Sequence, residues 1–123
     1  MNTMQLLIID SSDQRNDIRE WLNLMDLDNY TIELMTHSEA MTADIRNVNI
    51  FFLDGDYNGE WGLEVLHHIR KINPLSKVVF VSGHPTDANL RQALDAGANH
   101  ALGKPYELGV VRDLLTEYQR STE

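Results

Sequence analysis

Five short runs rich in apolar and β-branched residues recur along the chain, with longer mixed segments between them. Three of the runs, LLIID, NIFFLD and KVVFVS, are apolar almost without interruption, whereas YTIELM and HALG are weaker. Continuous apolar runs of this length are typical of parallel strands that are covered on both faces. The pattern therefore predicts five strands, at 6–10, 30–35, 49–54, 77–82 and 100–103.

The segments between these runs carry apolar residues at helical spacing. Ser38 can cap the second predicted helix, Thr86 or Asp87 can cap the fourth, and Gly97 is a natural residue to end it. The third stops before Pro74. The predicted helices are 13–26, 38–45, 60–72, 87–97 and 107–120. The apolar stripes of the third and fifth are Leu63, Leu66, Ile69 and Ile72, and Leu108, Val111, Leu115 and Tyr118.

Strands and helices thus alternate from one end of the chain to the other. A (βα)₅ order of this kind predicts a doubly wound α/β fold with a parallel five-stranded sheet. The 123 residues are enough for one domain with a real hydrophobic core, and no linker, repeat or low-complexity tract divides them. We expect a single domain over 1–123.

Composition narrows the class of partner. The formal net charge of -9 argues against direct binding to nucleic acid or to an anionic membrane. No apolar stretch approaches the length of a membrane span. Cysteine is absent, which fits a reducing compartment, and we expect a cytoplasmic location.

Chemically compatible side chains stand at the ends of four predicted strands. Asp10 ends the first, Asp54 the third and Ser82 the fourth, and Lys104 follows the fifth. In doubly wound sheets, ligands bind beyond the carboxyl ends of the strands, where these residues would meet. Any one of them alone is more easily explained as an exposed loop residue. Two carboxylates, a hydroxyl and an ammonium group at one edge indicate a site.

The chain resembles the CheY-like receiver domain of bacterial two-component response regulators over essentially its whole length. The matching stretches are LLIIDSSDQRNDIREWL, IFFLDGDYNGEWGLEVLHHIR, VVFVSGH and ALDAGANHALGKPYEL, in the family's order and at its spacing. The resemblance implies a flavodoxin-like fold with strand order 2-1-3-4-5. It also implies a receiver domain that stands alone or forms the first part of a longer response regulator.

The resemblance implies a role for each strand-end residue. Asp54 would accept a phosphoryl group, and Asp10, Asp54 and the backbone carbonyl of Asp56 would hold Mg²⁺. Lys104 would contact the phosphoryl oxygens, and the Ser82 hydroxyl would turn onto them as a switch. The implied donor is a histidine kinase or a phosphotransfer protein, and the implied target is an output domain or effector protein. The domain would not be an enzyme beyond its own phosphorylation and dephosphorylation.

The chain departs from the family pattern at two positions that bear on function. Ser11 stands where the family has a second acid, so we expect weak Mg²⁺ binding unless Asp13 reaches back to the ion. Ala101 stands where the family has an aromatic switch residue, so any conformational output must use other groups. His84, two residues after Ser82, is close enough to the edge to modulate the access of water to a phosphoaspartate.

Three other functions remain open on the sequence. A pseudo-receiver would keep the fold and act by protein contact without phosphorylation, which Ser11 and Ala101 favour. A haloacid-dehalogenase-like phosphatase would use Asp54 as nucleophile and Asp56 as acid, although that motif normally lies on the first strand of a longer chain. A flavin binder would need a phosphate-cradling loop after the first strand, where this chain has three acids and no glycine.

Overall fold

The computed structural model describes residues 3–10, 29–55, 60–104 and 106–121. Within them lie five parallel strands in the order β2-β1-β3-β4-β5. The strands are β1 (Met4–Ile9), β2 (Tyr30–Met35), β3 (Ile50–Asp54), β4 (Lys77–Ser82) and β5 (His100–Gly103). The helices are α2 (His37–Thr42), α3 (Glu60–Ile72), α4 (Asp87–Asp95) and α5 (Leu108–Ser121). The expected doubly wound α/β fold and its strand order are confirmed.

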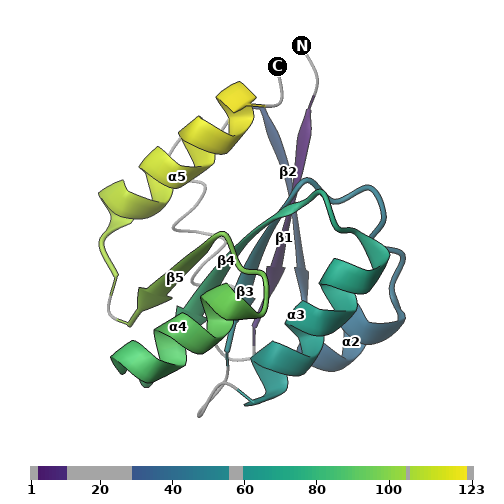
Figure 1. Cartoon of the computed structure of the whole chain (residues 1–123). Coiled ribbons are helices and arrows are strands. Elements are labelled where there is room, and N and C mark those ends of the chain that lie inside the picture. The colour runs from purple at the N-terminus through teal and green to yellow at the C-terminus, as the bar shows by residue number, and fades with distance from the viewer. Residues whose placement is uncertain (1–2, 11–28, 56–59, 105, 122–123) are drawn as a thin grey trace.

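Helices cover both faces of the sheet, as Figure 1 shows, with α5 on one side and α2, α3 and α4 on the other. Alternate side chains of each central strand therefore enter two separate cores. Ile8 and Phe52 pack with Val111 and Leu115 of α5. On the opposite face lies a second cluster, which includes Leu7, Phe51, Leu66, Ile69 and Phe80. This double burial explains why β1, β3 and β4 are apolar almost without interruption.

The second helix begins and ends earlier than the sequence predicted. Ser38 is not its cap; Thr36 is, and its hydroxyl accepts a hydrogen bond from the Glu39 amide at 3.1 Å. The Glu39 carboxylate in turn accepts one from the Thr36 amide at 2.8 Å. This capping box needs an acid three residues after the cap, and the residue three after Ser38 is Met41. The predicted end at Ile45 is also wrong, because the chain turns to an extended conformation at Ala43.

The other predicted helices that the structure describes agree closely with it. Helix α3 has the predicted bounds, and Thr86 caps α4 through a bond from the Asn89 amide. Ile72 is a correction, because it is 41% exposed at the end of α3, where the helix passes the edge of the core. The predicted helix at 13–26 lies outside the described residues. None of the described helices is both long and apolar enough to cross a membrane.

Arg70 of α3 joins two loops at the amino-terminal edge of the sheet. Its guanidinium group donates to the carbonyl oxygens of Gly97 at 2.8 Å and Ser76 at 2.9 Å, and to Asn99 Oδ1 at 2.9 Å. Gly97 has a φ of 113°, a left-handed conformation that glycine adopts without strain, and the predicted helix end is confirmed there. The planar guanidinium group suits several fixed acceptors at once.

Candidate functional site

The strand register brings the predicted residues to one edge of the sheet. Ile9 pairs with Leu53, so Asp10 and Asp54 follow on neighbouring strands. Ser82 pairs with Gly103, so Lys104 follows directly on the outer strand. The Lys104 amide continues this pairing with a bond to the Ser82 carbonyl at 2.9 Å. Adjacent strands lie about 4.8 Å apart, so the strand ends form one compact rim.

The two carboxylates of this rim are buried. Asp10 is 1% exposed and Asp54 is 6% exposed. Lys104 reaches across β4, and its Nζ lies 3.2 Å from Asp54 Oδ2, with about a third of the lysine side chain exposed. Buried charges are tolerated only where they are paired or bind a cation. Lys104 is the partner of Asp54, and the two neighbouring carboxylates together form a rim that suits a cation.

The donor set suits a hard divalent cation. Mg²⁺ prefers oxygen ligands and is often held by one or two protein carboxylates, with waters and phosphate oxygens completing its shell. Asp10 and Asp54 provide such carboxylates. Among the described residues no three His, Cys, Asp or Glu side chains gather closely enough to hold a metal ion by themselves. The predicted ligand Asp56, and Ser11 beside Asp10, lie outside those residues.

The predicted switch hydroxyl lies at the end of β4 and is hydrogen-bonded to the loop that follows. Ser82 is 2% exposed, and its Oγ accepts a hydrogen bond from the His84 amide at 3.1 Å. The His84 carbonyl accepts one from Asn89 Nδ2 of α4 at 2.8 Å. The residue His84 is exposed, as its predicted role at the edge of the site requires. The first turn of α4 is therefore linked through this loop to the Ser82 hydroxyl.

Close packing of glycines shapes the backbone around Asp54. A Cβ atom on Gly55 would lie 2.6 Å from the Phe80 ring, and one on Gly62 would lie 3.1 Å from the Asp54 carbonyl oxygen and still closer to Gly55 Cα. Only glycine permits this approach of α3 to the end of β3.

Ala101, at the position where the family has an aromatic residue, is half-buried and packs against the same core cluster as Phe80.

Two residues near the rim were not singled out from the sequence. Tyr106 packs edge-on against Phe52, with ring centroids 5.7 Å apart. Burial, with smaller contributions from the negative charges of Asp10 and Asp54, raises the pKa of Tyr106 to about 12. A neutral phenol therefore lies near the acidic rim. Its position two residues after Lys104 was the available signal, but an aromatic residue there also suits a simple packing role.

His37 is the other overlooked residue. It is 4% exposed, and its Nε2 lies 2.7 Å from the carbonyl oxygen of Asp54. The signal available in the sequence was a histidine two residues after the second strand, near the same rim. Its contact with a residue 17 positions away depends on the strand order, which local periodicity does not reveal.

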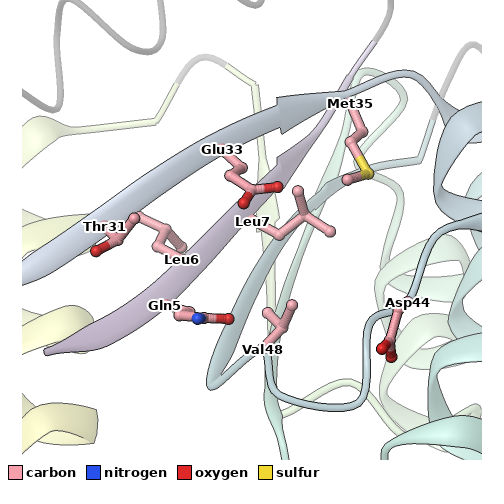
Figure 2. A pocket seen from close by; sticks show the side chains of 8 residues that line it. All are labelled: Gln5, Leu6, Leu7, Thr31, Glu33, Met35, Asp44 and Val48. Atoms are coloured by element: carbon pink, nitrogen blue, oxygen red, sulfur yellow. The ribbon is translucent and has the colours of Figure 1, made fainter.

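A pocket elsewhere on the sheet is separate from this rim. Figure 2 shows it between β1, β2 and the loop that follows α2, with Leu7 and Glu33 from paired strands among its walls. It is lined by Gln5, Leu6, Leu7, Thr31, Glu33, Met35, Asp44 and Val48. Asp10, Asp54, Ser82 and Lys104 do not line this pocket. The candidate site is therefore the rim and not the pocket.

Comparison with known proteins identifies the family of the chain. The model of the response regulator receiver domain family matches residues 6–116. The osmosensing histidine protein kinase SLN1 of Saccharomyces cerevisiae is 25% identical over an alignment of 119 residues, which covers 92% of this chain and 10% of that protein. The chain thus spans about a tenth of the length of this curated relative.

Solved structures share the fold. A CheY-like response regulator receiver domain protein from Methanospirillum hungatei JF-1 is 25% identical, with a TM-score of 0.74 over 98% of this chain and 94% of that one. A response regulator from Burkholderia pseudomallei, solved with a phosphorylated aspartic acid and a calcium ion, is 20% identical. Its TM-score is 0.73 over 97% of this chain and 71% of that one.

Proposed function

Because the chain belongs to the response regulator receiver domain family, we propose that it is a phosphoacceptor signalling domain whose acceptor is Asp54. The observation that carries the proposal is the contact of 3.2 Å between Lys104 Nζ and Asp54 Oδ2. A phosphoryl group on this carboxylate would lie within reach of the ammonium group. Lysine serves well as such a point-charge partner for phosphoryl oxygens.

In the proposed transfer, a carboxylate oxygen of Asp54 forms a bond to phosphorus. The bond between phosphorus and the donor breaks, and the donor keeps its electron pair. With a histidine kinase or a phosphotransfer protein as donor, the broken bond is the one to an imidazole nitrogen. Both reactants are anionic, so transfer depends on positive charge placed around the phosphoryl oxygens, part of which Lys104 supplies.

The same proposal includes a cation at the acidic rim. Asp10 and Asp54, with the backbone carbonyl of Asp56, would hold Mg²⁺, which supplies charge neutralisation when bound. Ser11 in place of a second acid would make this binding weak. The Ser82 hydroxyl would donate to the new phosphoryl group, and the Ser82 carbonyl already contacts the Lys104 amide. His84 would control the access of water to the phosphoaspartate.

The proposed partners follow from this chemistry. A histidine kinase or phosphotransfer protein would supply the phosphoryl group, and an output domain or effector protein would recognise the changed surface. Receiver domains are signalling domains, and we expect catalysis limited to the domain's own phosphorylation and dephosphorylation. The net charge of -9 disfavours direct contact with nucleic acid or an anionic membrane, and the proposed partner is a protein of the cytoplasm.

The direct test is the intact mass of the protein after incubation with a small acyl-phosphate donor and Mg²⁺. We expect the addition of one phosphoryl group, which hydroxylamine removes because it is an acyl phosphate. Asp54→Asn should abolish the addition while the protein stays folded. Asp113→Asn, which changes an exposed acid on α5, should leave it intact. Undiminished labelling of the Asp54→Asn protein would place the acceptor elsewhere.

A pseudo-receiver that acts by protein contact alone is the second candidate. The half-buried Ala101 favours it, because a methyl group lacks the bulk of a ring that moves between buried and exposed positions. The intact-mass experiment separates the two candidates: a wild-type protein that takes no phosphoryl group at high donor and Mg²⁺ concentrations would support the pseudo-receiver.

A further inference from the structure

The peptide unit between Asp54 and Gly55 is held from two opposite sides. Its N–H group, which belongs to Gly55, donates to the Val81 carbonyl of β4 at 2.7 Å. Its carbonyl oxygen, which belongs to Asp54, lies 2.7 Å from Nε2 of His37. The N–H and C=O groups of a trans peptide point in opposite directions, so the two contacts together fix the plane of this unit.

The second contact does not come from a strand. The β1–β3 ladder ends at the pair Ile9 and Leu53, one residue before Asp54. A buried carbonyl beyond the end of a ladder needs a donor from elsewhere. His37 supplies it from the first residue of α2, just beyond β2, the strand on the far side of β1. The Thr36–Glu39 capping box fixes the start of α2 and with it the position of the imidazole.

The geometry also fixes the form of the imidazole. A carbonyl oxygen can only accept a hydrogen bond, so Nε2 must carry the proton and donate it. The acceptor is the main-chain oxygen of the very residue proposed to take the phosphoryl group. Because the side chain of Asp54 leaves the same Cα atom, the peptide plane constrains the direction from which its carboxylate approaches Lys104.

We propose that His37 is a positioning residue for phosphorylation: it locks the Asp54–Gly55 peptide so that the Asp54 carboxylate is held in line for transfer. This inference rests on the proposed function of Asp54 and adds a residue outside the strand-end set. It differs from a purely structural role, in which loss of His37 would lower stability but leave the reaction of the folded protein unchanged.

The test compares two amide replacements that differ by one methylene group. In His37→Gln the side-chain nitrogen can reach the place of Nε2, whereas in His37→Asn it stops near that of Nδ1. His67→Asn, on the exposed face of α3, is the matched control. Each folded protein is treated with the acyl-phosphate donor and Mg²⁺. The rate constant of phosphorylation at saturating donor is measured, and the concentrations of donor and of Mg²⁺ that give half the maximal rate are measured separately.

We expect His37→Asn to lower the saturating rate constant about tenfold, because a reacting group misplaced by about 1 Å can cost up to about a hundredfold in rate. The rate constant of His37→Gln should lie within about threefold of the wild-type value, and that of His67→Asn should equal it. A folded His37→Asn protein that reacts at the wild-type rate would overturn the proposal, as would equal losses in both His37 variants. If His37→Asn does not fold, His37→Phe, which keeps the ring but removes the donor, takes its place.

A second measurement separates this inference from the proposed function. Hydrogen exchange of the Gly55 amide reports the same peptide unit without any phosphoryl transfer. Exchange at Gly55 should accelerate in His37→Asn, or in His37→Phe where that replaces it, relative to the amides of β3, and His37→Gln should restore protection. If the wild-type protein takes no phosphoryl group, the proposed function is wrong. The exchange rate of the Gly55 amide still shows whether His37 locks the peptide. Unchanged Gly55 exchange would refute the lock.

Discussion

Lys104 Nζ lies 3.2 Å from Asp54 Oδ2, although 50 residues separate the two along the chain. The contact spans β4, which lies between their strands in the sheet. It joins an ammonium group to a carboxylate that is almost fully buried. The arrangement holds a positive charge at the place where a phosphoryl group on Asp54 would extend.

Replacement of Lys104 tests this relationship. We expect Lys104→Ala to lower the extent of phosphorylation by the acyl-phosphate donor or to uncouple it from partner binding, because the phosphoryl oxygens lose their fixed cation. A loss of about 1 to 3 kcal/mol, or roughly 5- to 150-fold, is the scale of one charge-assisted contact. Labelling is measured by intact mass, with Lys71→Ala on the exposed end of α3 as control. Wild-type labelling and signalling would make Lys104 an ordinary loop residue.

Metal affinity should respond to the residue after Asp10. Restoring the second acid with Ser11→Asp should tighten Mg²⁺ binding by at least about tenfold and speed phosphorylation, because it adds a carboxylate at the rim. Titration calorimetry of both proteins measures the change. Asp13→Ala is measured beside it. If Asp13→Ala abolishes Mg²⁺ binding while Ser11→Asp has no effect, Asp13 is already the missing ligand and this account of the site is wrong.

The tyrosines predict a loss of stability in alkali. Burial raises the pKa of Tyr106 from 10.0 to about 12, and those of Tyr30 and Tyr118 to the same value. Below about pH 10 both the folded and the unfolded chain keep these protons, so their contribution is complete. Between about pH 10 and 12 the unfolded chain releases them first, and the free energy of unfolding falls as pH rises.

Tyr106→Phe should make this alkaline fall less steep, because one of the three groups no longer titrates. The urea midpoints of both proteins at about pH 9 and about pH 11 give the slopes. Absorbance of tyrosinate in the folded protein checks that Tyr30 and Tyr118 still titrate late. Equal slopes in the two proteins would show that Tyr106 ionises alike in the folded and unfolded chains.

Arg70 should be important for stability and not for phosphorylation. Arg70→Met keeps much of the side chain's length but removes the donors to Gly97, Ser76 and Asn99. We expect the free energy of unfolding to fall by about 1 to 3 kcal/mol, since acceptors that lose their partner are costly. Urea unfolding measures it, with Arg91→Met on the exposed face of α4 as control. An equal effect of both substitutions would show that the loop contacts contribute nothing.

The sequence alone determined the sheet and most of the site. Strands buried on both faces must be apolar throughout, so β1, β3 and β4 were predicted to within two residues. Because parallel strands end at a common edge, residues at their ends could be assigned to one rim without coordinates. Asp10, Asp54, Ser82 and Lys104 were found in this way. Local capping chemistry likewise predicted Thr86 as one of two caps for α4.

Tertiary structure decided which groups touch within that frame. Whether Lys104 meets Asp54, and whether His37 reaches the Asp54 carbonyl, depends on strand order and register. These contacts join residues that are distant in the chain, and helical or strand periodicity carries information only about near neighbours. The chain therefore revealed which side chains stand at the rim, while the packing of α2 against the sheet determined that an imidazole holds the peptide of the proposed acceptor.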